Sequence, residues 1–417
     1  MTERALQSDH AADETADETY VFDPFAEGFT EDPYPHYRRL RDSGPVQQHP
    51  LGFWILSRYD DVSELLRSGL SVEERHIGPG PMRDLNEAVY GDRDERMNGL
   101  SMLDKDPPDH TRLRRLVSKA FTPRSIAALE PRVEALVDGY LDRMAGAGRA
   151  DLVTELAFPL PFAVISQMMG MPDTDHARLR ELTGTLVRSL EPVADPEVLT
   201  AIMAADEELS AMARDTIAWK RGHLTDDLLS RLIQAEDDGD VLDDDELVAQ
   251  VLLLYIAGHE TTVNLIGGGV LALLRSPDQL TLLRESPSLA GNAVEELLRY
   301  DSPVQMSRRI PLEPITVAGQ EIPAGAFVIA SLASANRDER FWGDDAGALR
   351  LDRANAHQHV SFGAGVHHCL GAALARLEGR VAISRLVQRF PRLALDGEVA
   401  WNGRINLRGP AHLPVAL

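Results

Sequence analysis

The only cysteine of the chain lies in a glycine-rich stretch that constrains the fold more than any other feature. Residues 362–371 read FGAGVHHCLG. Gly363 and Gly365 permit a tight backbone in which several N–H groups point at one sulfur. A helix expected to begin near Leu370 would place the positive end of its dipole beside Cys369. Both effects favour a thiolate, whereas a lone buried cysteine elsewhere is an inert hydrophobic residue.

The spacing Phe-Gly-x-Gly-x-His-x-Cys-x-Gly resembles the haem-binding loop of the cytochrome P450 monooxygenases and matches it at every fixed position. The resemblance implies that Cys369 is the axial thiolate ligand of a haem b iron and that His367 donates to a haem propionate. It also implies that Phe362 and Gly363 belong to the haem pocket. Gly371 would let the following helix lie close to the porphyrin.

A zinc site is the alternative interpretation of the same stretch. Its ligands would be His367, His368 and Cys369, which are consecutive in the chain. Zinc favours ligands separated by turns of backbone, and the chain has no second cysteine. The haem interpretation is therefore preferred.

A basic helix is expected after Asp106. His110 and Arg114 are four residues apart, so they share one face of that helix. From the residues alone, a solvated basic helix remains open. By resemblance, the pair binds the two haem propionates, which suits two cationic donors facing two carboxylates. Arg309 matches a further propionate-binding arginine of the family.

A long apolar stretch, residues 248–274, carries the polar string AGHETT at 257–262. By resemblance, Ala257 and Gly258 lie over the distal haem face, where Gly258 leaves a groove for O2. Glu260 and Thr261 would form an acid–alcohol pair, because splitting O2 needs two protons and a hydroxyl backed by a carboxylate is a short relay. The threonine hydroxyls can bond carbonyls one turn back. His259 is expected to point away.

Glu296 and Arg299 are three residues apart on another expected helix. Such ion pairs are common and contribute only a few tenths of a kcal/mol at a surface. By resemblance, they occupy the Glu-x-x-Arg position of the family, and Arg353 is the third member of that structural network.

The composition bounds the class of protein. With 417 residues, 44% hydrophobic and 26% charged, and no linker or repeat, one large domain is expected at 21–417, after a disordered acidic leader at 1–20. The polar centre of residues 248–274 predicts a buried helix rather than a membrane span. A net charge of −24 argues against nucleic acid and anionic membranes as partners. One cysteine and no signal peptide predict a cytoplasmic protein.

The remaining pattern is mostly helical with a small β region, as the cytochrome P450 resemblance implies. A helix is expected from Thr122, as N-cap before Pro123, to about Met144. Strands are expected near 315–317 and 327–330, with β-like segments at 405–407 and 414–415. Residues 71–100 read as a long loop, which is usually functional.

A local basic segment lies in this acidic chain. Between 111 and 129 there is no acidic residue, while Arg112, Arg115, Lys119 and Arg124 are present. It can be a charged face without a partner. Our hypothesis is that Arg112 and Arg115 dock an acidic ferredoxin-type electron donor on the cysteine side of the haem.

The resemblance implies a haem-thiolate monooxygenase that inserts one atom of O2 into a hydrophobic small molecule, by hydroxylation or epoxidation, with a separate ferredoxin and reductase. A peroxide-driven peroxygenase or decarboxylase and a non-catalytic haem sensor remain alternatives. Residues 71–100, 179–205 and 303–306 are expected to line the substrate site. Their apolar character suggests a product of secondary metabolism, such as a polyketide, terpenoid, steroid or fatty acid.

Overall fold

The computed structural model describes residues 20–90, 100–170, 176–191, 195–237 and 239–417. Apart from Tyr20, the expected leader at 1–20 lies outside these ranges. The α-helices are α1 Tyr34–Ser43, α2 Tyr59–Arg67, α3 Pro81–Tyr90, α4 Asp109–Ala120, α5 Pro123–Ala127, α6 Glu130–Ala145, α7 Pro159–Met169, α8 His176–Leu186, α9 Pro196–Arg221, α10 Leu228–Ile233, α11 Asp244–Leu274, α12 Pro277–Glu285, α13 Ala290–Tyr300, α14 Leu332–Ala335, α15 Glu339–Trp342 and α16 Ala372–Arg389. Short 3₁₀ or π turns are η1 Glu74–His76, η2 Val153–Ala157, η3 Val187–Leu190, η4 Pro287–Leu289, η5 Ala356–Gln358 and η6 Gly365–His367.

The strands are short. They are β1 Val46–Gln48, β2 Phe53–Leu56, β3 Arg149–Asp151, β4 Glu236–Asp237, β5 Asp240–Val241, β6 Met306–Arg309, β7 Ile315–Val317, β8 Gln320–Ile322, β9 Phe327–Ser331, β10 Ala394–Leu395, β11 Ala400–Trp401, β12 Pro410–His412 and β13 Pro414–Ala416. One sheet has the order β1-β2-β9-β6, with β2 parallel to β9 and the other pairs antiparallel. A second has the order β10-β13-β3. The expectation of a mostly helical chain with a small β region is confirmed.

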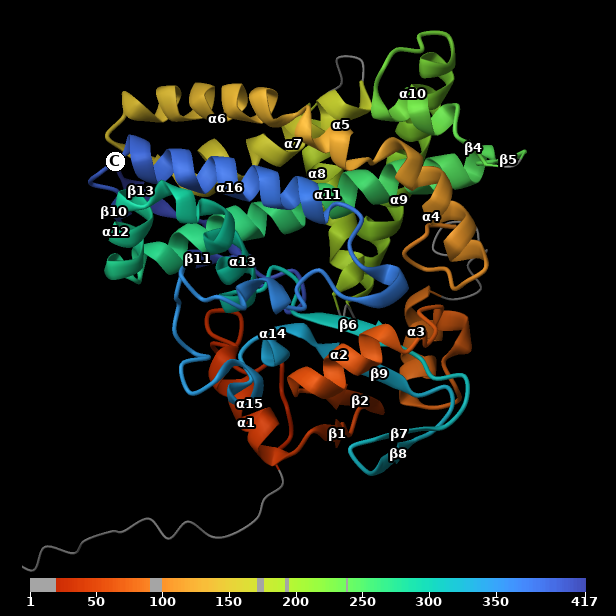
Figure 1. Ribbon diagram of the computed structural model, residues 1–417. Helices are drawn as coiled ribbons and strands as arrows, with labels where there is room; N and C mark the ends of the chain where they lie inside the picture. The colour runs from red at the N-terminus through yellow and green to blue at the C-terminus, as the bar shows by residue number, and fades with distance from the viewer. Residues whose placement is uncertain (1–19, 91–99, 171–175, 192–194, 238) are drawn as a thin grey trace, which may run out of the picture.

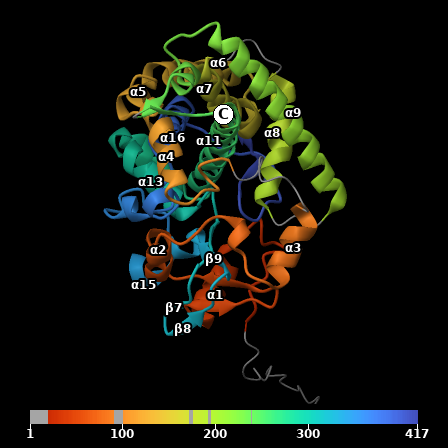
Figure 2. The same ribbon diagram turned by 90° about the vertical axis from the view of Figure 1, so that its right-hand side faces the viewer.

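Helices and the larger sheet occupy different parts of the molecule. In Figure 1, α6, α16 and α11 run across the upper part, and the sheet of β1, β2, β9 and β6 lies below them with α1 and α2. Figure 2 shows α9 and α8 flanking this helical part along one side. The cysteine loop, which precedes α16, joins the two parts, because its Gly365 lies against α2.

Helix α11 is the centre of the helical part. Asp243 and Glu246 form a capping box at its start, and most of its residues are buried, as expected for a helix that is apolar all round. Packing is close: a Cβ added at Gly379 of α16 would lie 3.0 Å from Leu265 of α11. No helix among the described residues is long and apolar enough to cross a membrane.

Two expected elements in the N-terminal part of the chain differ from the structure. Residues 71–100 contain the turn η1 and the helix α3, which begins at Pro81, so the interpretation as one long loop is wrong for its described part. Thr122 caps a helix with Ser125 as expected, but α5 ends at Ala127. A second helix, α6, then begins with Pro131 in its first turn, where proline needs no N–H partner.

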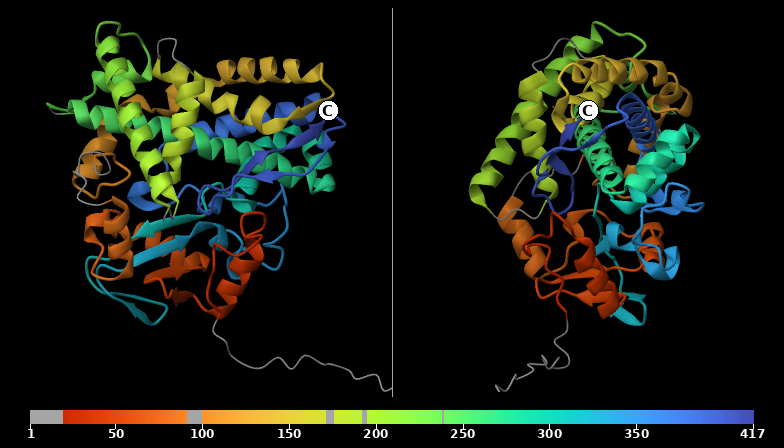
Figure 3. Two further views of the ribbon diagram at one scale, coloured as in Figure 1. Left: turned by 180° about the vertical axis from the view of Figure 1, so that it is seen from behind. Right: turned by 90° about the vertical axis from the view of Figure 1, so that its left-hand side faces the viewer.

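The expected strand at 405–407 does not form. Leu407 makes an isolated bridge to Val304, and residues 405 and 406 form a bend. The backbone N–H groups of all three residues donate to the carboxylate of Glu191. They are therefore unavailable to a neighbouring strand. Figure 3 shows this C-terminal part of the chain, in dark blue, beside α11.

Candidate active site

The loop around Cys369 is held by its glycines. Gly363 and Gly365 have φ values of 65° and 69°, which other residues rarely adopt. A Cβ at Gly365 would lie 2.6 Å from the carbonyl oxygen of Leu66, so α2 approaches too closely for any side chain. The Cys369 N–H donates to the carbonyl of Phe362 at 2.9 Å, which closes the loop.

The surroundings of the Cys369 sulfur are electropositive. Protein atoms crowd the thiol and this burial raises its pKa, although part of the side chain remains exposed. The backbone N–H groups of Gly371 and Ala372 and the guanidinium groups of Arg114 and Arg376 act in the opposite direction. Gly371 is also the N-cap of α16. These groups stabilise a thiolate, and a coordinated cation would deprotonate the thiol outright.

Two histidines meet beside this loop. The ring of His110, from α4, lies 4.2 Å from the ring of His367 between centroids. His110 is buried, and within the described part of the chain neither of its ring nitrogens nor Nε2 of His367 has a hydrogen-bond partner. Burial, with His110 and Arg309 nearby, lowers the pKa of His367 to about 3.

Two arginines complete this group of donors. Arg114 donates from Nη2 to the carbonyl of His368 at 2.6 Å and so reaches the cysteine loop. Arg309, on β6, is 4% exposed and donates to the carbonyl of Arg308 at 2.6 Å and to the hydroxyl of Ser307 at 3.0 Å. Burial and the neighbouring Arg308 lower the pKa of Arg309 to about 10.

These donors fit the carboxylates of a haem. His110, Arg114 and Arg309 all act electrostatically on His367, which places them around one point beside the cysteine loop. Buried polar atoms normally have partners, so three unpartnered ring nitrogens there are a clear exception. The two propionates of a haem would supply hydrogen-bond acceptors for these nitrogens. The zinc alternative is wrong, because no group of three or more His, Cys, Asp or Glu side chains in the described ranges could hold a metal ion.

The polar string of α11 lies within a continuous helix. The hydroxyl of Thr261 donates to the carbonyl of Ala257 at 2.8 Å, and that of Thr262 donates to the carbonyl of Gly258 at 3.3 Å. His259 packs edge-on against Phe158, the N-cap of α7, and its Nε2 lies 3.2 Å from the Phe158 carbonyl oxygen. It therefore points toward α7, away from the Thr261 side of the helix.

The partner of Glu260 was missed by sequence reasoning. Arg404, in the C-terminal segment, donates from Nη1 to Glu260 Oε1, and its Nη2 donates to the carbonyl of Gly184 in α8 at 3.4 Å. The two charged residues are 144 positions apart, and Arg404 lies in no recognisable motif. No local spacing in the sequence pointed to this pair.

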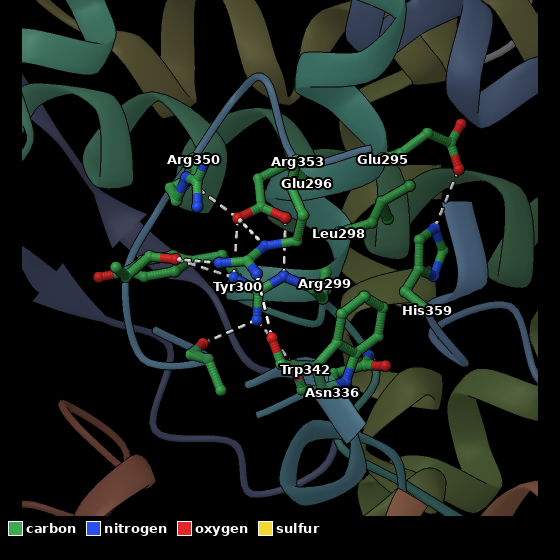
Figure 4. A network of polar contacts seen from close by, with 12 residues as sticks. Glu295, Glu296, Leu298, Arg299, Tyr300, Asn336, Trp342, Arg350, Arg353 and His359 are labelled. Atoms are coloured by element: carbon green, nitrogen blue, oxygen red, sulfur yellow. Dashed lines mark hydrogen bonds and ion pairs between the residues drawn. The ribbon is translucent and has the colours of Figure 1, made fainter. Parts of the chain in front are cut away.

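The Glu296–Arg299 pair is fully buried and bidentate, with two N···O distances of 2.7 Å. Figure 4 shows that Arg353 and the backbone N–H of Arg350 also converge on Glu296. Arg299 donates further to the carbonyls of Asn336, Ala346 and Ala348. This network joins α13 to the segment that leads into the cysteine loop.

The basic segment on α4 is partly neutralised. Arg112 forms ion pairs with Asp240 and Glu246. Both partners belong to the acidic stretch 236–246, in which Asp243 also caps α11. The side chains of Arg115 and Lys119, also on α4, are exposed.

Comparisons with known proteins give one answer. A family model described as Cytochrome P450 matches residues 197–400. The chain is 41% identical to the cytochrome P450 monooxygenase PikC of Streptomyces venezuelae, over 93% of this chain and 91% of that one. It is 42% identical to the vitamin D(3) 25-hydroxylase of Pseudonocardia autotrophica, over 96% and 97%. The crystal structure of the myxobacterial cytochrome P450 CYP267B1 with myristic acid superposes with a TM-score of 0.85 at 38% identity, covering 94% and 98%.

Proposed function

The chain belongs to the cytochrome P450 family and is a haem-thiolate monooxygenase, and from this premise we propose which of its residues do the work. Cys369 would supply the axial thiolate. His110, Arg114, His367 and Arg309 would bind the propionates. The observation that carries the proposal is the set of unpartnered ring nitrogens of His110 and His367 beside the only thiol of the chain.

The haem, when bound, activates O2 so that one oxygen atom enters a C–H or C=C bond and the other leaves as water, which consumes two electrons and two protons. The protein must supply the protons and keep bulk water out. Glu260 and Thr261 are adjacent on α11, and we assign them this proton delivery. Gly258 leaves room beside them, since a Cβ added there would meet Ile165 at no less than 3.9 Å.

The electron donor would be an acidic ferredoxin served by its own reductase. We assign the docking contact to the basic segment on α4, where Arg115 and Lys119 are exposed. A chain with a single cysteine suits the reducing cytoplasm, where such donors work.

The substrate would be a medium-sized apolar molecule. Vitamin D(3), for which the Pseudonocardia hydroxylase is named, and myristic acid, which is bound in the CYP267B1 structure, are suitable probes because both are hydrophobic. Binding of each is measured as a spin-state shift of the haem absorption. Product is then measured with reduced ferredoxin and O2, and separately with hydrogen peroxide alone.

Thr261→Ala tests the assignment, with Thr262→Ala as the matched control on the same helix. Thr261→Ala should keep the haem and the spin-state shift but divert reducing equivalents to peroxide, so that product per electron pair falls at least about a hundredfold, the lower end of the usual scale of general acid–base catalysis. Thr262→Ala should stay coupled. Equal coupling in both variants, or turnover by peroxide alone, would contradict the proposal.

A further inference from the structure

The guanidinium of Arg404 forms an ion pair with Glu260, the carboxylate assigned to proton delivery. We propose that Arg404 is a positioning residue for Glu260 and that Glu191 fixes the loop from which Arg404 reaches. The inference deepens the proposed function and rests on it, since it assumes that Glu260 lies on the distal side of the haem. It adds two residues that neither the motifs nor the spacing of the sequence point to.

The ion pair is largely shielded from water. The side chains of Glu260 and Arg404 are 15% and 17% exposed. At such sites the attraction between opposite charges is several times stronger than in bulk water, and a carboxylate without a partner is costly to bury. A carboxylate at the end of a flexible side chain has several rotamers available. The guanidinium of Arg404 selects one of them.

The position of Arg404 is itself fixed by its neighbours in the chain. Both oxygens of Glu191 accept hydrogen bonds from the next three N–H groups, those of residues 405–407, at 2.8–2.9 Å. The carbonyl of Leu407 accepts from Asn264 of α11 at 3.2 Å and from Asn402 at 2.8 Å. The loop is therefore tied both to α11 and to the segment that follows η3.

The same contacts tie the relay to the expected substrate wall. Arg404 also donates to the carbonyl of Gly184 in α8, and Glu191 directly follows η3. Both belong to residues 179–205, which were expected to line the substrate site. Through Arg404, the place of the Glu260 carboxylate thus depends on how α8 and η3 are packed.

Carbon monoxide is a suitable probe, because its stretching frequency in the reduced, haem-loaded protein reports the electric field on the distal side without substrate or turnover. The full chain is compared with Glu260→Gln, Arg404→Gln, Arg404→Lys and Glu191→Ala. Arg380→Gln is the matched control, since Arg380 also joins two elements by an ion pair, with Glu130 at 2.6 Å between α16 and α6.

Glu260→Gln should shift the carbon monoxide stretching band, because it removes the negative charge of the Glu260 carboxylate. Arg404→Gln should shift and split it, because the carboxylate then occupies several positions, and Arg404→Lys should restore one band. Glu191→Ala should split the band more weakly, and Arg380→Gln should leave it unchanged. A wild-type band in Arg404→Gln, with a shifted band in Glu260→Gln, overturns the positioning role alone. A wild-type band in Glu260→Gln overturns the assignment of Glu260 and with it the proposed relay.

Thermal unfolding of the same proteins gives an independent reading. The losses in Tm from Arg404→Gln and Glu260→Gln should be non-additive, with the double variant losing less than their sum, because either single change already breaks the pair. Additive losses would show that the two side chains do not interact in solution and would overturn the inference.

Discussion

The ring of His110 packs against the ring of His367 at 4.2 Å, and together they present three buried ring nitrogens that no group among the described residues satisfies. One ring comes from α4 and the other from the cysteine loop. Their meeting point therefore depends on the whole fold, and it is where the propionates of a haem would neutralise the donors.

Replacing His110 by phenylalanine keeps a ring of similar size and removes both nitrogens. We expect His110→Phe to fold but to lose haem about tenfold faster, because a hydrogen bond to a charged group contributes about 1.5–3 kcal/mol. Transfer of haem to excess apomyoglobin measures the rate. His357→Phe is the control, because His357 is exposed, and its rate of haem loss should equal that of the wild type. Equal rates for both variants would remove His110 from the propionate site.

Glu296 is the centre of the buried network, and both it and Arg299 are 0% exposed. Glu296→Gln leaves the guanidinium of Arg299 without its counter-charge, so the free energy of unfolding should fall by about 3–5 kcal/mol. Glu130→Gln breaks a half-exposed pair with Arg380 and should cost less than about 1 kcal/mol. Urea unfolding at equal haem content measures both. Similar losses in the two variants would contradict a structural role for the network.

Glu378 of α16 is 1% exposed, and its Oε2 has no hydrogen-bond partner among the residues described. Burial raises the pKa of Glu378 to about 8. The folded protein therefore holds this proton over a pH range in which the unfolded chain has lost it. The free energy of unfolding should fall as pH rises from about 4.5 to 8, by at most about 1.4 kcal/mol per pH unit from this group.

The test of that dependence compares Tm values at pH 5.5 and pH 8.5. Relative to the wild type, Glu378→Gln should gain Tm on going to the higher pH, because its amide has no proton to lose. The exposed Glu398→Gln serves as control and should follow the wild type at both values. A constant difference between Glu378→Gln and wild type would mean that the buried carboxyl does not titrate in this range.

Arg115→Glu should slow reduction by an acidic ferredoxin at low salt several-fold, because electrostatic attraction governs the rate of association. The spin-state shift with myristic acid should stay unchanged. Stopped-flow reduction across a salt series measures the effect, which should shrink as salt screens the charges. Arg143→Glu, at the far end of α6, makes the same charge change away from α4. If it slows reduction equally, α4 is not the docking site.

Local patterns predicted the parts of the site that are built from consecutive residues. The cysteine loop, the Thr261 back-bond and the capping by Thr122 depend on a few neighbouring positions, so spacing alone predicts them. The helix α3 was missed because Gly and Pro were taken as breakers, although Pro81 starts it. Pro131 likewise starts a helix inside the stretch expected to be continuous.

Contacts between distant segments could not be predicted in the same way. The pairs of Arg404 with Glu260 and of Arg112 with Glu246 join segments more than a hundred residues apart. Arg404, Arg112 and Glu246 belong to no motif, and each alone resembles an ordinary surface charge. Glu260 does belong to a motif, but that motif does not identify its partner. The pattern of residues 405–407 predicted a strand, because the sequence does not reveal that the backbone N–H groups of these residues donate to the carboxylate of Glu191.

The central claim is that the sulfur of Cys369 binds the iron, and carbon monoxide tests it most directly. The haem-loaded protein is reduced, exposed to carbon monoxide and scanned. We predict the strongly red-shifted Soret band of a thiolate-ligated haem, and its loss in Cys369→Ala. A band at the position typical of an imidazole-ligated haem in fully loaded wild-type protein, or a red-shifted band that persists in Cys369→Ala, would contradict the account.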